Sequence, residues 1–234
     1  MMAYTVAING YGRIGRSLLR ALYGPTYRSH FKIVAINEPA EIETIAYLTR
    51  YDTTHGRFPL PVQHQNNLLL IGDDSIHITG EKDPAHLQWP RPPIDILFEC
   101  SGSFDDLQTA HNYLQTGVRK LLFSHPATSE VDATIIYGFN QNTLKPWHKI
   151  VSNGSCTTNC IVPILEILQR EFGIESGVTT TIHSAMNDQP VSDCFHHSNL
   201  RLARSGLQSV IPVDTGLAKG IERLMPELAG KFQC

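Results

Sequence analysis

A glycine-rich turn near the start of the chain limits the possible fold more than any other feature. The run Tyr4 to Ile8 is apolar and β-prone, and the sequence Gly-Tyr-Gly-Arg-Ile-Gly follows at residues 10–15. Apolar side chains then recur every three to four positions from Arg13 to Tyr23, which predicts a helix. A second predicted strand, Lys32 to Asn37, is followed directly by Glu38. Strand, glycine turn, helix and strand in this order predict a dinucleotide-binding βαβ unit.

Each glycine of this turn has a separate physical task in such a site. Gly10 makes the tight turn, Gly12 lets the backbone approach a pyrophosphate, and Gly15 packs the helix against the strand. The helix N-terminus adds N–H donors and the positive end of its dipole. Glu38 can accept hydrogen bonds from ribose hydroxyls and repels a 2′-phosphate, which favours NAD over NADP. A glycine turn that binds no ligand is the alternative.

Strand and helix patterns alternate along the rest of the first 155 residues. Further elements are predicted as follows: strands at residues 94–98, 120–124 and 149–152, helices at 41–50 and 105–115, and a hairpin at 68–79. Strands that are apolar throughout and separated by helices indicate a parallel sheet covered on both faces. We therefore predict an α/β chain with a Rossmann-type, doubly wound parallel sheet over residues 1–155.

Charge and composition argue against several classes of partner. The 234 residues carry a net charge of −3, which gives no footprint for nucleic acid or for an anionic membrane. The longest apolar stretches are strand-sized, so no transmembrane helix is predicted. Five cysteines without a CxxC pair, and no N-terminal apolar segment, predict a reduced, cytoplasmic protein. No spacing of cysteine and histidine suits a metal, and none is predicted.

A cysteine stands where a predicted strand passes into a predicted helix. Cys156 lies in the segment Ser-Cys-Thr-Thr-Asn-Cys at residues 155–160, and the helix runs to about Arg170. A thiol at a helix N-terminus lies near the positive end of the dipole, which favours the thiolate. His183 follows a predicted strand over residues 178–182, and a crossover of this length returns strand ends to one edge of a sheet, where the two could meet. A buried cysteine and a structural histidine are the alternatives, and Cys160 is predicted to be core or a passive neighbour.

Six segments, taken in order, resemble the glyceraldehyde-3-phosphate dehydrogenase superfamily over essentially the whole chain. They are AINGYGRIGR, YDTTHGRF, FECSG, SNGSCTTNC, TTIHSAM and IPVDTG. Within the superfamily the chain is most similar to the erythrose-4-phosphate dehydrogenases. Glu38 stands in place of the aspartate of the glycolytic enzymes, and Phe-Ser-His-Pro at residues 123–126 replaces an ISAP-like segment. Met186 stands where the glycolytic enzymes have a phosphate-contacting threonine.

The resemblance implies NAD-dependent oxidation of D-erythrose 4-phosphate to 4-phosphoerythronate, which feeds pyridoxal 5′-phosphate (pyridoxine) biosynthesis. Cys156 would form a thiohemiacetal with the aldehyde, and His183 would take its hydroxyl proton. Water would then cleave the thioester, whereas the glycolytic enzymes use phosphate. Phosphorylating oxidation of glyceraldehyde 3-phosphate and a catalytically inactive NAD-binding fragment are the alternatives.

The resemblance also implies two sets of binding residues and an assembly. The cofactor-binding set is Asn9, Gly10, Gly12, Arg13, Ile14, Gly15, Glu38, Ser101 and Ser124. The substrate-binding set is Ser155, Thr157, Arg201, Thr215 and Gly216. Full-length relatives resemble homotetramers in which a long loop, here residues 187–205, meets a neighbouring subunit near the cofactor. A final helix is predicted up to about Leu224, capped by Asp214 or Thr215.

Three departures from the family pattern qualify these expectations. Relatives continue for roughly a hundred residues beyond Cys234, so residues 156–234 are expected to be the N-terminal part of an α+β catalytic domain whose remainder is absent. Such a chain is expected to be weakly active or inactive alone. Leu202 replaces the second of two paired arginines. His77 stands where erythrose-4-phosphate dehydrogenases have a cofactor-contacting arginine, and imidazole is a weaker anion partner.

Overall fold

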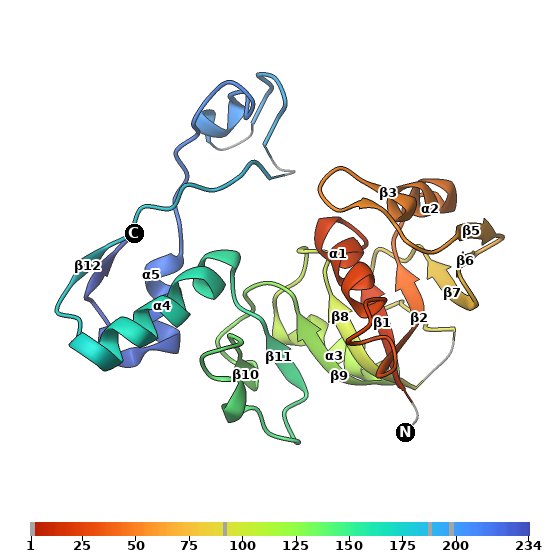
Figure 1. The fold of residues 1–234 in the computed structure, drawn as a ribbon, viewed down its shortest axis with the longest axis horizontal. Helices are drawn as coiled ribbons and strands as arrows, with labels where there is room; N and C mark the ends of the chain where they lie inside the picture. The colour runs from red at the N-terminus through yellow and green to blue at the C-terminus, as the bar shows by residue number, and fades with distance from the viewer. Residues whose placement is uncertain (1–2, 91–92, 187–188, 197–198) are drawn as a thin grey trace. The chain divides into compact units, whose positions relative to one another are not determined.

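The computed structural model describes residues 3–90, 93–186, 189–196 and 199–234. The chain divides into two compact units, Met1–Asn159 and Cys160–Cys234 (Figure 1). Among the described residues, the first unit is built on a nine-stranded sheet and the second contains short helices and a two-stranded sheet. Helix α4, Cys156–Phe172, begins in the first unit and continues into the second.

The large sheet has the strand order β10-β11-β9-β8-β1-β2-β7-β6-β5. Its strands are β1 Tyr4–Asn9, β2 Phe31–Asn37, β5 Val62–Gln65, β6 Leu68–Ile71, β7 Asp74–Thr79, β8 Ile94–Glu99, β9 Val118–Phe123, β10 Ala133–Thr134 and β11 Ile150–Ser152. Neighbours from β10 to β7 pair in parallel, and β7, β6 and β5 continue antiparallel. The chain runs from β1 outward to β2 and β7 and then returns to β8 on the other side of β1. This reversal creates a topological switch point, where open α/β sheets bind ligands beyond the carboxyl ends of their strands.

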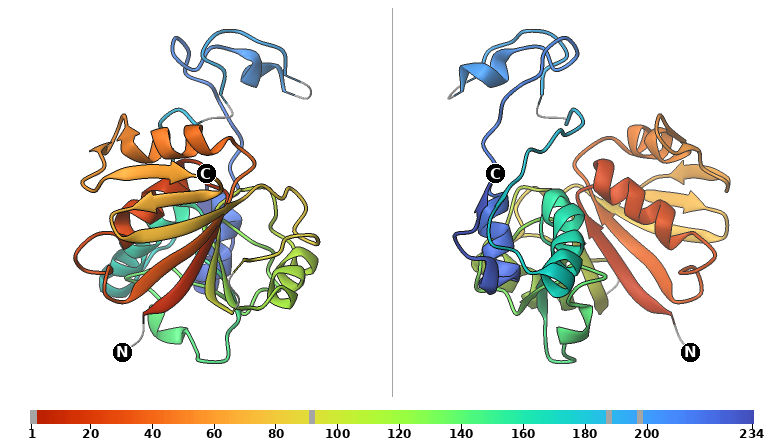
Figure 2. Two further views of the ribbon diagram at one scale, coloured as in Figure 1. Left: turned by 90° about the vertical axis from the view of Figure 1, so that its right-hand side faces the viewer. Right: turned by 60° about the vertical axis from the view of Figure 1, so that its left-hand side comes forward.

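Alternate residues of the central strands supply two separate cores. On one face Val6 and Ile8 of β1 belong to a cluster with Leu19 of α1, Arg13–Leu22, and Ile45 of α2, Ile42–Arg50. On the other face Ala7 belongs to a cluster with Tyr113 of α3, Leu107–Gln115. Figure 2 shows the helices on both sides of the sheet. The predicted α/β fold with a doubly wound, mostly parallel sheet is therefore confirmed.

The second unit contains little regular structure. After α4 come β12 Gly177–Val178, the 3₁₀ turn η2 Leu200–Ala203, α5 Leu217–Leu224, η3 Pro226–Leu228 and β13 Phe232–Gln233. The predicted strand over residues 178–182 is wrong beyond Val178, because β12 pairs only with the two residues of β13. Ile182 is 96% exposed, so its apolar side chain has no core to enter. Across the described residues, no helix combines the length and apolar character needed to cross a bilayer.

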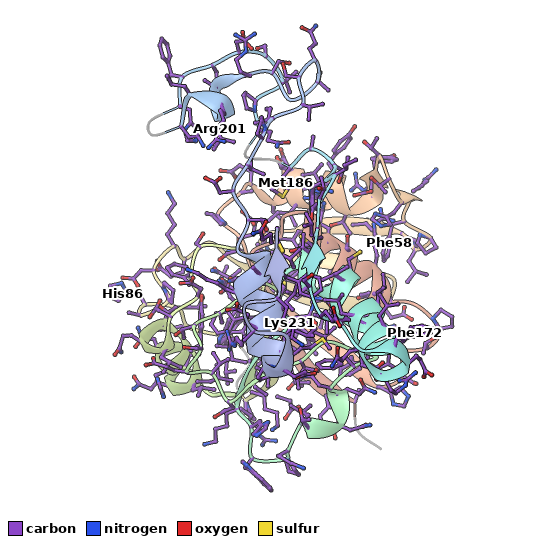
Figure 3. All side chains as sticks on the ribbon, turned by 90° about the vertical axis from the view of Figure 1, so that its left-hand side faces the viewer. Phe58, His86, Phe172, Met186, Arg201 and Lys231 are labelled. Carbon is purple, nitrogen blue, oxygen red and sulfur yellow. The ribbon has the colours of Figure 1, made fainter. Side chains whose placement is uncertain are left out.

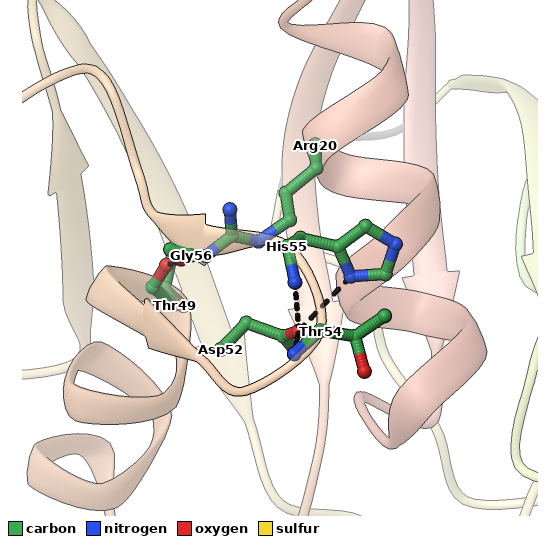
Figure 4. Close-up of polar contacts among 6 residues, drawn as sticks. All are labelled: Arg20, Thr49, Asp52, Thr54, His55 and Gly56. Carbon is green, nitrogen blue, oxygen red and sulfur yellow. Dashed lines mark hydrogen bonds and ion pairs between the residues drawn. The ribbon is translucent and has the colours of Figure 1, made fainter.

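A hairpin in the YDTTHGRF segment is held against α1 by polar contacts (Figure 4). Strands β3 Tyr51–Asp52 and β4 Gly56–Arg57 form it. The carboxylate of Asp52 accepts hydrogen bonds from the backbone N–H groups of Thr54 and His55, at 2.9 and 2.8 Å, and its Oδ1 lies 3.0 Å from His55 Nδ1. From α1, Arg20 donates to the carbonyls of Thr49 and Gly56, at 3.1 and 3.0 Å. The turn is therefore organised around one carboxylate and one guanidinium.

The Asp52 carboxylate is expected to stabilise the fold in a pH-dependent way. The hydrogen bond from the His55 backbone, with further ones from the His55 side chain and Thr54, lowers the pKa of Asp52 from 3.8 to about 2. A lowered carboxyl pKa contributes stability above pH 3.8, and that contribution is lost as the pH falls toward 2. Asp52→Asn should lower the unfolding free energy near neutral pH by about 1 kcal/mol, or roughly 3 °C in melting temperature.

Thermal unfolding followed by circular dichroism between neutral pH and pH 2 would test this expectation. The difference in melting temperature between Asp52→Asn and the unaltered protein should disappear as the pH falls. Asp73→Asn, in the exposed β6–β7 turn, is the matched control and should melt with the unaltered chain. If the difference in melting temperature stayed the same down to pH 2, the charge on Asp52 would not be the cause of the stabilisation.

Candidate cofactor and active site

The glycine turn after β1 is fixed by the protein's own backbone at two of its three glycines. Gly10 has a φ of +82°, and a Cβ on it would lie 2.4 Å from the Cα and N atoms of Ser101. A Cβ on Gly15 would lie 2.3 Å from the Gly10 carbonyl oxygen. Gly10 therefore makes the turn and Gly15 allows α1 to pack on it, as the motif predicts.

Gly12 is different, because the described residues leave room for a side chain there. A Cβ on Gly12 would meet no atom within 4 Å. Gly12 is the N-cap of α1 and provides no side-chain cap, so the first turn of the helix directs its N–H groups outward. Arg13 and Ile14 follow on the same turn, both exposed. Open space before an uncapped helix N-terminus fits the pyrophosphate of a dinucleotide.

A cleft of about 340 Å³ opens beside this turn, beyond the carboxyl ends of β1, β2 and β8. Five of the predicted cofactor residues line it: Asn9, Gly10, Gly12, Glu38 and Ser101. Oε2 of Glu38 accepts a hydrogen bond of 2.8 Å from the Tyr11 backbone, so this carboxylate is held at the glycine turn. Ser124 follows β9, is half-buried, and donates its backbone N–H to the Glu99 carbonyl at 3.0 Å. The residues present thus fit NAD in the cleft at the switch point.

Sequence reasoning missed the buried polar residues beneath this cleft. Asn37 ends β2, Glu99 ends β8, and Tyr113 comes from α3. The side chain of Asn9, predicted to bind the cofactor, donates to Glu99 at 2.6 Å and to the Tyr113 hydroxyl at 2.8 Å. Burial, and then the Glu99 carboxylate, raise the pKa of Tyr113 above its usual range. The available signal was a polar residue at the end of each apolar strand, KIVAIN and IDILFE.

The two cysteines of interest in the first unit have contrasting surroundings. Cys100 lines the cleft, and burial raises its pKa to about 12, so its thiol stays protonated. Cys156 is exposed and is the first residue of α4. Cys160, one helical turn later in the second unit, is also exposed, so of its two predicted roles the core position is wrong and that of a passive neighbour remains. Exposure and position at a helix N-terminus distinguish Cys156 as the candidate nucleophile.

The start of α4 is shaped by reciprocal capping around Ser155. The Ser155 hydroxyl accepts from the Thr158 backbone at 3.0 Å, and the Ser155 backbone donates to Thr158 Oγ1 at 2.8 Å. Gly154, with a φ of +67°, makes the turn that precedes the cap. The hydroxyl oxygens of Ser155 and Thr157 lie 2.9 Å apart, so two predicted substrate residues stand beside Cys156. This capping fixes Cys156 at the first position of the helix.

The remaining predicted residues belong to the second unit. His183 is exposed, and its Nδ1 lies 2.7 Å from the Ser184 carbonyl oxygen. Arg201, in η2 (Figure 3), pairs with Asp214 at 3.6 Å. The predicted final helix is confirmed, but its predicted cap is wrong: Gly216 and not Asp214 or Thr215 is the N-cap of α5, and Thr215 Oγ1 accepts from the Leu217 backbone at 3.2 Å. Cys156 and His183 belong to different units, and their pairing stays a prediction.

Two departures and the long loop also have places in the structure. His77 lies half-buried in β7, paired with Ala35 of β2 and Leu68 of β6. Leu202 lies half-buried in η2 beside Arg201. Part of the predicted subunit-contacting loop, residues 187–188 and 197–198, lies outside the described residues.

Comparison with known families agrees with this arrangement. The family model described as the glyceraldehyde 3-phosphate dehydrogenase NAD binding domain matches residues 4–107. The model described as the glyceraldehyde 3-phosphate dehydrogenase C-terminal domain matches residues 155–234. Together the two models match well over half of the chain, and the first includes the glycine turn, Glu38 and Ser101. The chain therefore belongs to the glyceraldehyde-3-phosphate dehydrogenase superfamily and is an NAD-dependent oxidoreductase that acts on aldehydes.

Proposed function

We propose that this enzyme oxidises D-erythrose 4-phosphate to 4-phosphoerythronate, a step that would serve pyridoxal 5′-phosphate synthesis. One observation carries the choice of substrate. The segment Phe123–Pro126, which resembles the erythrose-4-phosphate dehydrogenases, contacts the wall of the cofactor cleft. His125 Nε2 lies 2.9 Å from the carbonyl oxygen of Phe104, and Phe104 lines the cleft. The sequence difference from the glycolytic enzymes thus lies beside the candidate cofactor cleft and not on a remote surface.

The chain's own residues supply the covalent chemistry in this proposal. The Cys156 sulfur adds to the aldehyde carbon, and the carbonyl oxygen takes a proton to give a thiohemiacetal. His183 then removes the hydroxyl proton as the C–H bond breaks. NAD, when bound, supplies the hydride acceptor. Attack of water on the resulting thioester releases the acid and returns the thiol.

A phosphate contact of the glycolytic enzymes is missing at position 186. Met186 (Figure 3) is 43% exposed and has a thioether where the glycolytic enzymes have a hydroxyl. A thioether cannot donate a hydrogen bond to an anion. A phosphate therefore loses one contact at this position, and Arg201, Thr215 and Gly216 are the other residues proposed to bind the substrate. Assembly as a homotetramer and a cytoplasmic location belong to the same proposal.

Oxidation of glyceraldehyde 3-phosphate with phosphate is the second candidate, because both matching family models bear that enzyme's description. NADH absorbance would be followed with each aldehyde, with and without inorganic phosphate, and the product identified by mass spectrometry. Because this chain is expected to be weakly active alone, we expect slow NADH formation that is independent of phosphate, prefers the four-carbon sugar and gives a free acid as product. A strict phosphate requirement with an acyl phosphate product would establish the second candidate. If neither aldehyde gives one equivalent of NADH per chain, this polypeptide is a binding module only.

A further inference from the structure

A chain of side-chain hydrogen bonds crosses the carboxyl ends of four adjacent strands directly beneath the cofactor cleft. It begins after β7, where the Glu81 backbone N–H donates to Asn37 Oδ1 at 2.8 Å. Asn37 Nδ2 donates to Asn9 Oδ1 at 2.7 Å, and Asn9 Nδ2 donates to Glu99 Oε2 at 2.6 Å. From the other side, the Ser101 backbone N–H donates to Glu99 Oε1 at 2.7 Å. Donors therefore point toward Glu99 from both directions.

The direction of this chain cannot be reversed. Its two ends are backbone N–H groups, of Glu81 and Ser101, and a backbone N–H can only donate. Asn37 Nδ2 also donates to the Glu81 carbonyl at 2.7 Å, which fixes the orientation of that amide. The orientation of the Asn37 amide fixes that of the Asn9 amide, so that Asn9 must donate. This series of hydrogen bonds therefore needs a terminal group that only accepts. A carboxylate at position 99 meets this requirement, because both of its oxygens accept. With an amide at position 99, its N–H group would face another donor.

The three side chains at the centre of this hydrogen-bond chain are buried beside the cleft. Glu99 is 0% exposed, Asn9 4% and Asn37 5%. Tyr113 closes the set by donating its hydroxyl to Glu99 Oε2 at 2.6 Å. Asn9, Asn37, Glu81, Ser101 and Tyr113 all line the cleft, whereas Glu99 lies behind them. A donor left without its acceptor at such a depth is costly.

Glu99 controls the position of the turn that faces the glycine loop. Its carboxylate holds both the backbone N–H and the hydroxyl of Ser101. That same backbone is the one a Cβ on Gly10 would approach to 2.4 Å. The main chain of Glu99 also accepts from the Ser124 N–H at 3.0 Å. A shift of Glu99 would therefore move Ser101 and Ser124, both predicted to bind the cofactor, relative to the glycine turn.

We propose that Glu99 is a positioning residue for NAD: it is the terminal acceptor of this directional chain and fixes the Ser101 turn against Gly10. It acts through Ser101 and Asn9 and not by touching the cofactor. The proposal concerns NAD binding and is independent of which aldehyde is oxidised.

The first test is isothermal titration of NAD into Glu99→Gln in the absence of any aldehyde. We expect the dissociation constant to rise about 10- to 100-fold, because one donor in the chain must lose its acceptor. Tyr113→Phe keeps the ring but removes one of the hydrogen bonds to Glu99, and should give a smaller rise. The melting temperature of each ligand-free variant is recorded alongside. Unchanged NAD affinity with a lowered melting temperature would show a merely structural carboxylate and overturn the proposal.

Moving the carboxylate from position 99 to position 9 tests whether the direction of the hydrogen bonds matters, and not only the packing of the side chains. Asn9→Asp alone places two carboxylates together and should weaken NAD binding. Combined with Glu99→Gln, it moves the acceptor one step along the chain. The new amide at position 99 then donates to the new carboxylate at position 9 and still accepts from Ser101, so the double variant should bind NAD more tightly than either single variant. A double variant whose losses add would overturn the proposal, as would one that fails to fold. If Glu99→Gln alone does not fold, the double variant decides the question.

Discussion

Cys156→Ser is expected to form NADH from the aldehyde at least about 1000-fold more slowly than the unaltered chain. A serine hydroxyl is a far weaker nucleophile than a cysteine sulfur. Capping by Ser155 and Thr158 does not involve the Cys156 side chain, so α4 should begin at the same residue in the variant. Since Cys156 does not line the cofactor cleft, NAD affinity should be unchanged.

Cys160→Ser is the matched control for this experiment. Cys160 lies one turn further along the same helix and is also exposed, so the two substitutions are chemically and locally alike. The control should retain activity within about twofold, as surface substitutions commonly do. Rates of NADH formation and NAD titration would be measured for both variants. Loss of activity in Cys160→Ser with retention in Cys156→Ser would transfer the nucleophile to the second position.

The cofactor half of the protein was predictable because its signals are local. The glycine spacing, the apolar run before it and the periodic helix after it lie within about twenty residues, a typical span for a βα unit. The observed β1 and α1, Tyr4–Asn9 and Arg13–Leu22, differ from the predicted ranges by one residue at their ends. Gly10 shows why: its positive φ and its close approach to Ser101 leave no other residue type suitable.

Features that depend on distant partners were not predictable from the sequence. Asn9 and Glu99 bond across 90 positions of chain, and nothing near either residue indicates the other. The β3–β4 hairpin depends on Arg20 of α1 reaching carbonyls some thirty residues later. The predicted strand after Gly177 had suitable β-branched residues, but strand length follows the available partner and not propensity alone. The pairing of Cys156 with His183 likewise depends on residues that are distant in the sequence, and it stays a prediction.

Gly12 and Gly10 should respond in opposite ways to the same added methyl group, and this contrast is the most direct test of the cofactor site. Gly12 has a φ of −71° and open space around it, so Gly12→Ala should cost less than about 1 kcal/mol of stability. A methyl group there would occupy the space through which a pyrophosphate approaches the helix N-terminus. We expect the NAD dissociation constant to rise at least about tenfold.

Gly10→Ala should instead act on the fold. A left-handed backbone costs alanine about 1–2 kcal/mol, and forcing a methyl group to 2.4 Å from the Ser101 backbone adds about 1–3 kcal/mol more. The melting temperature should fall by roughly 6 °C or more, and NAD binding should weaken because the turn and Ser101 are displaced together.

Thermal unfolding and NAD titration of both variants give four measurements. Normal NAD affinity in a stable Gly12→Ala protein would show that the open space is not the pyrophosphate site, whereas an unstable Gly12→Ala would mean that the glycine is required by the fold. The proposed roles require that Gly12→Ala loses NAD binding but keeps its stability, and that Gly10→Ala loses both. In that case Gly10 is required by the fold of the turn, and Gly12 is required by the bound cofactor.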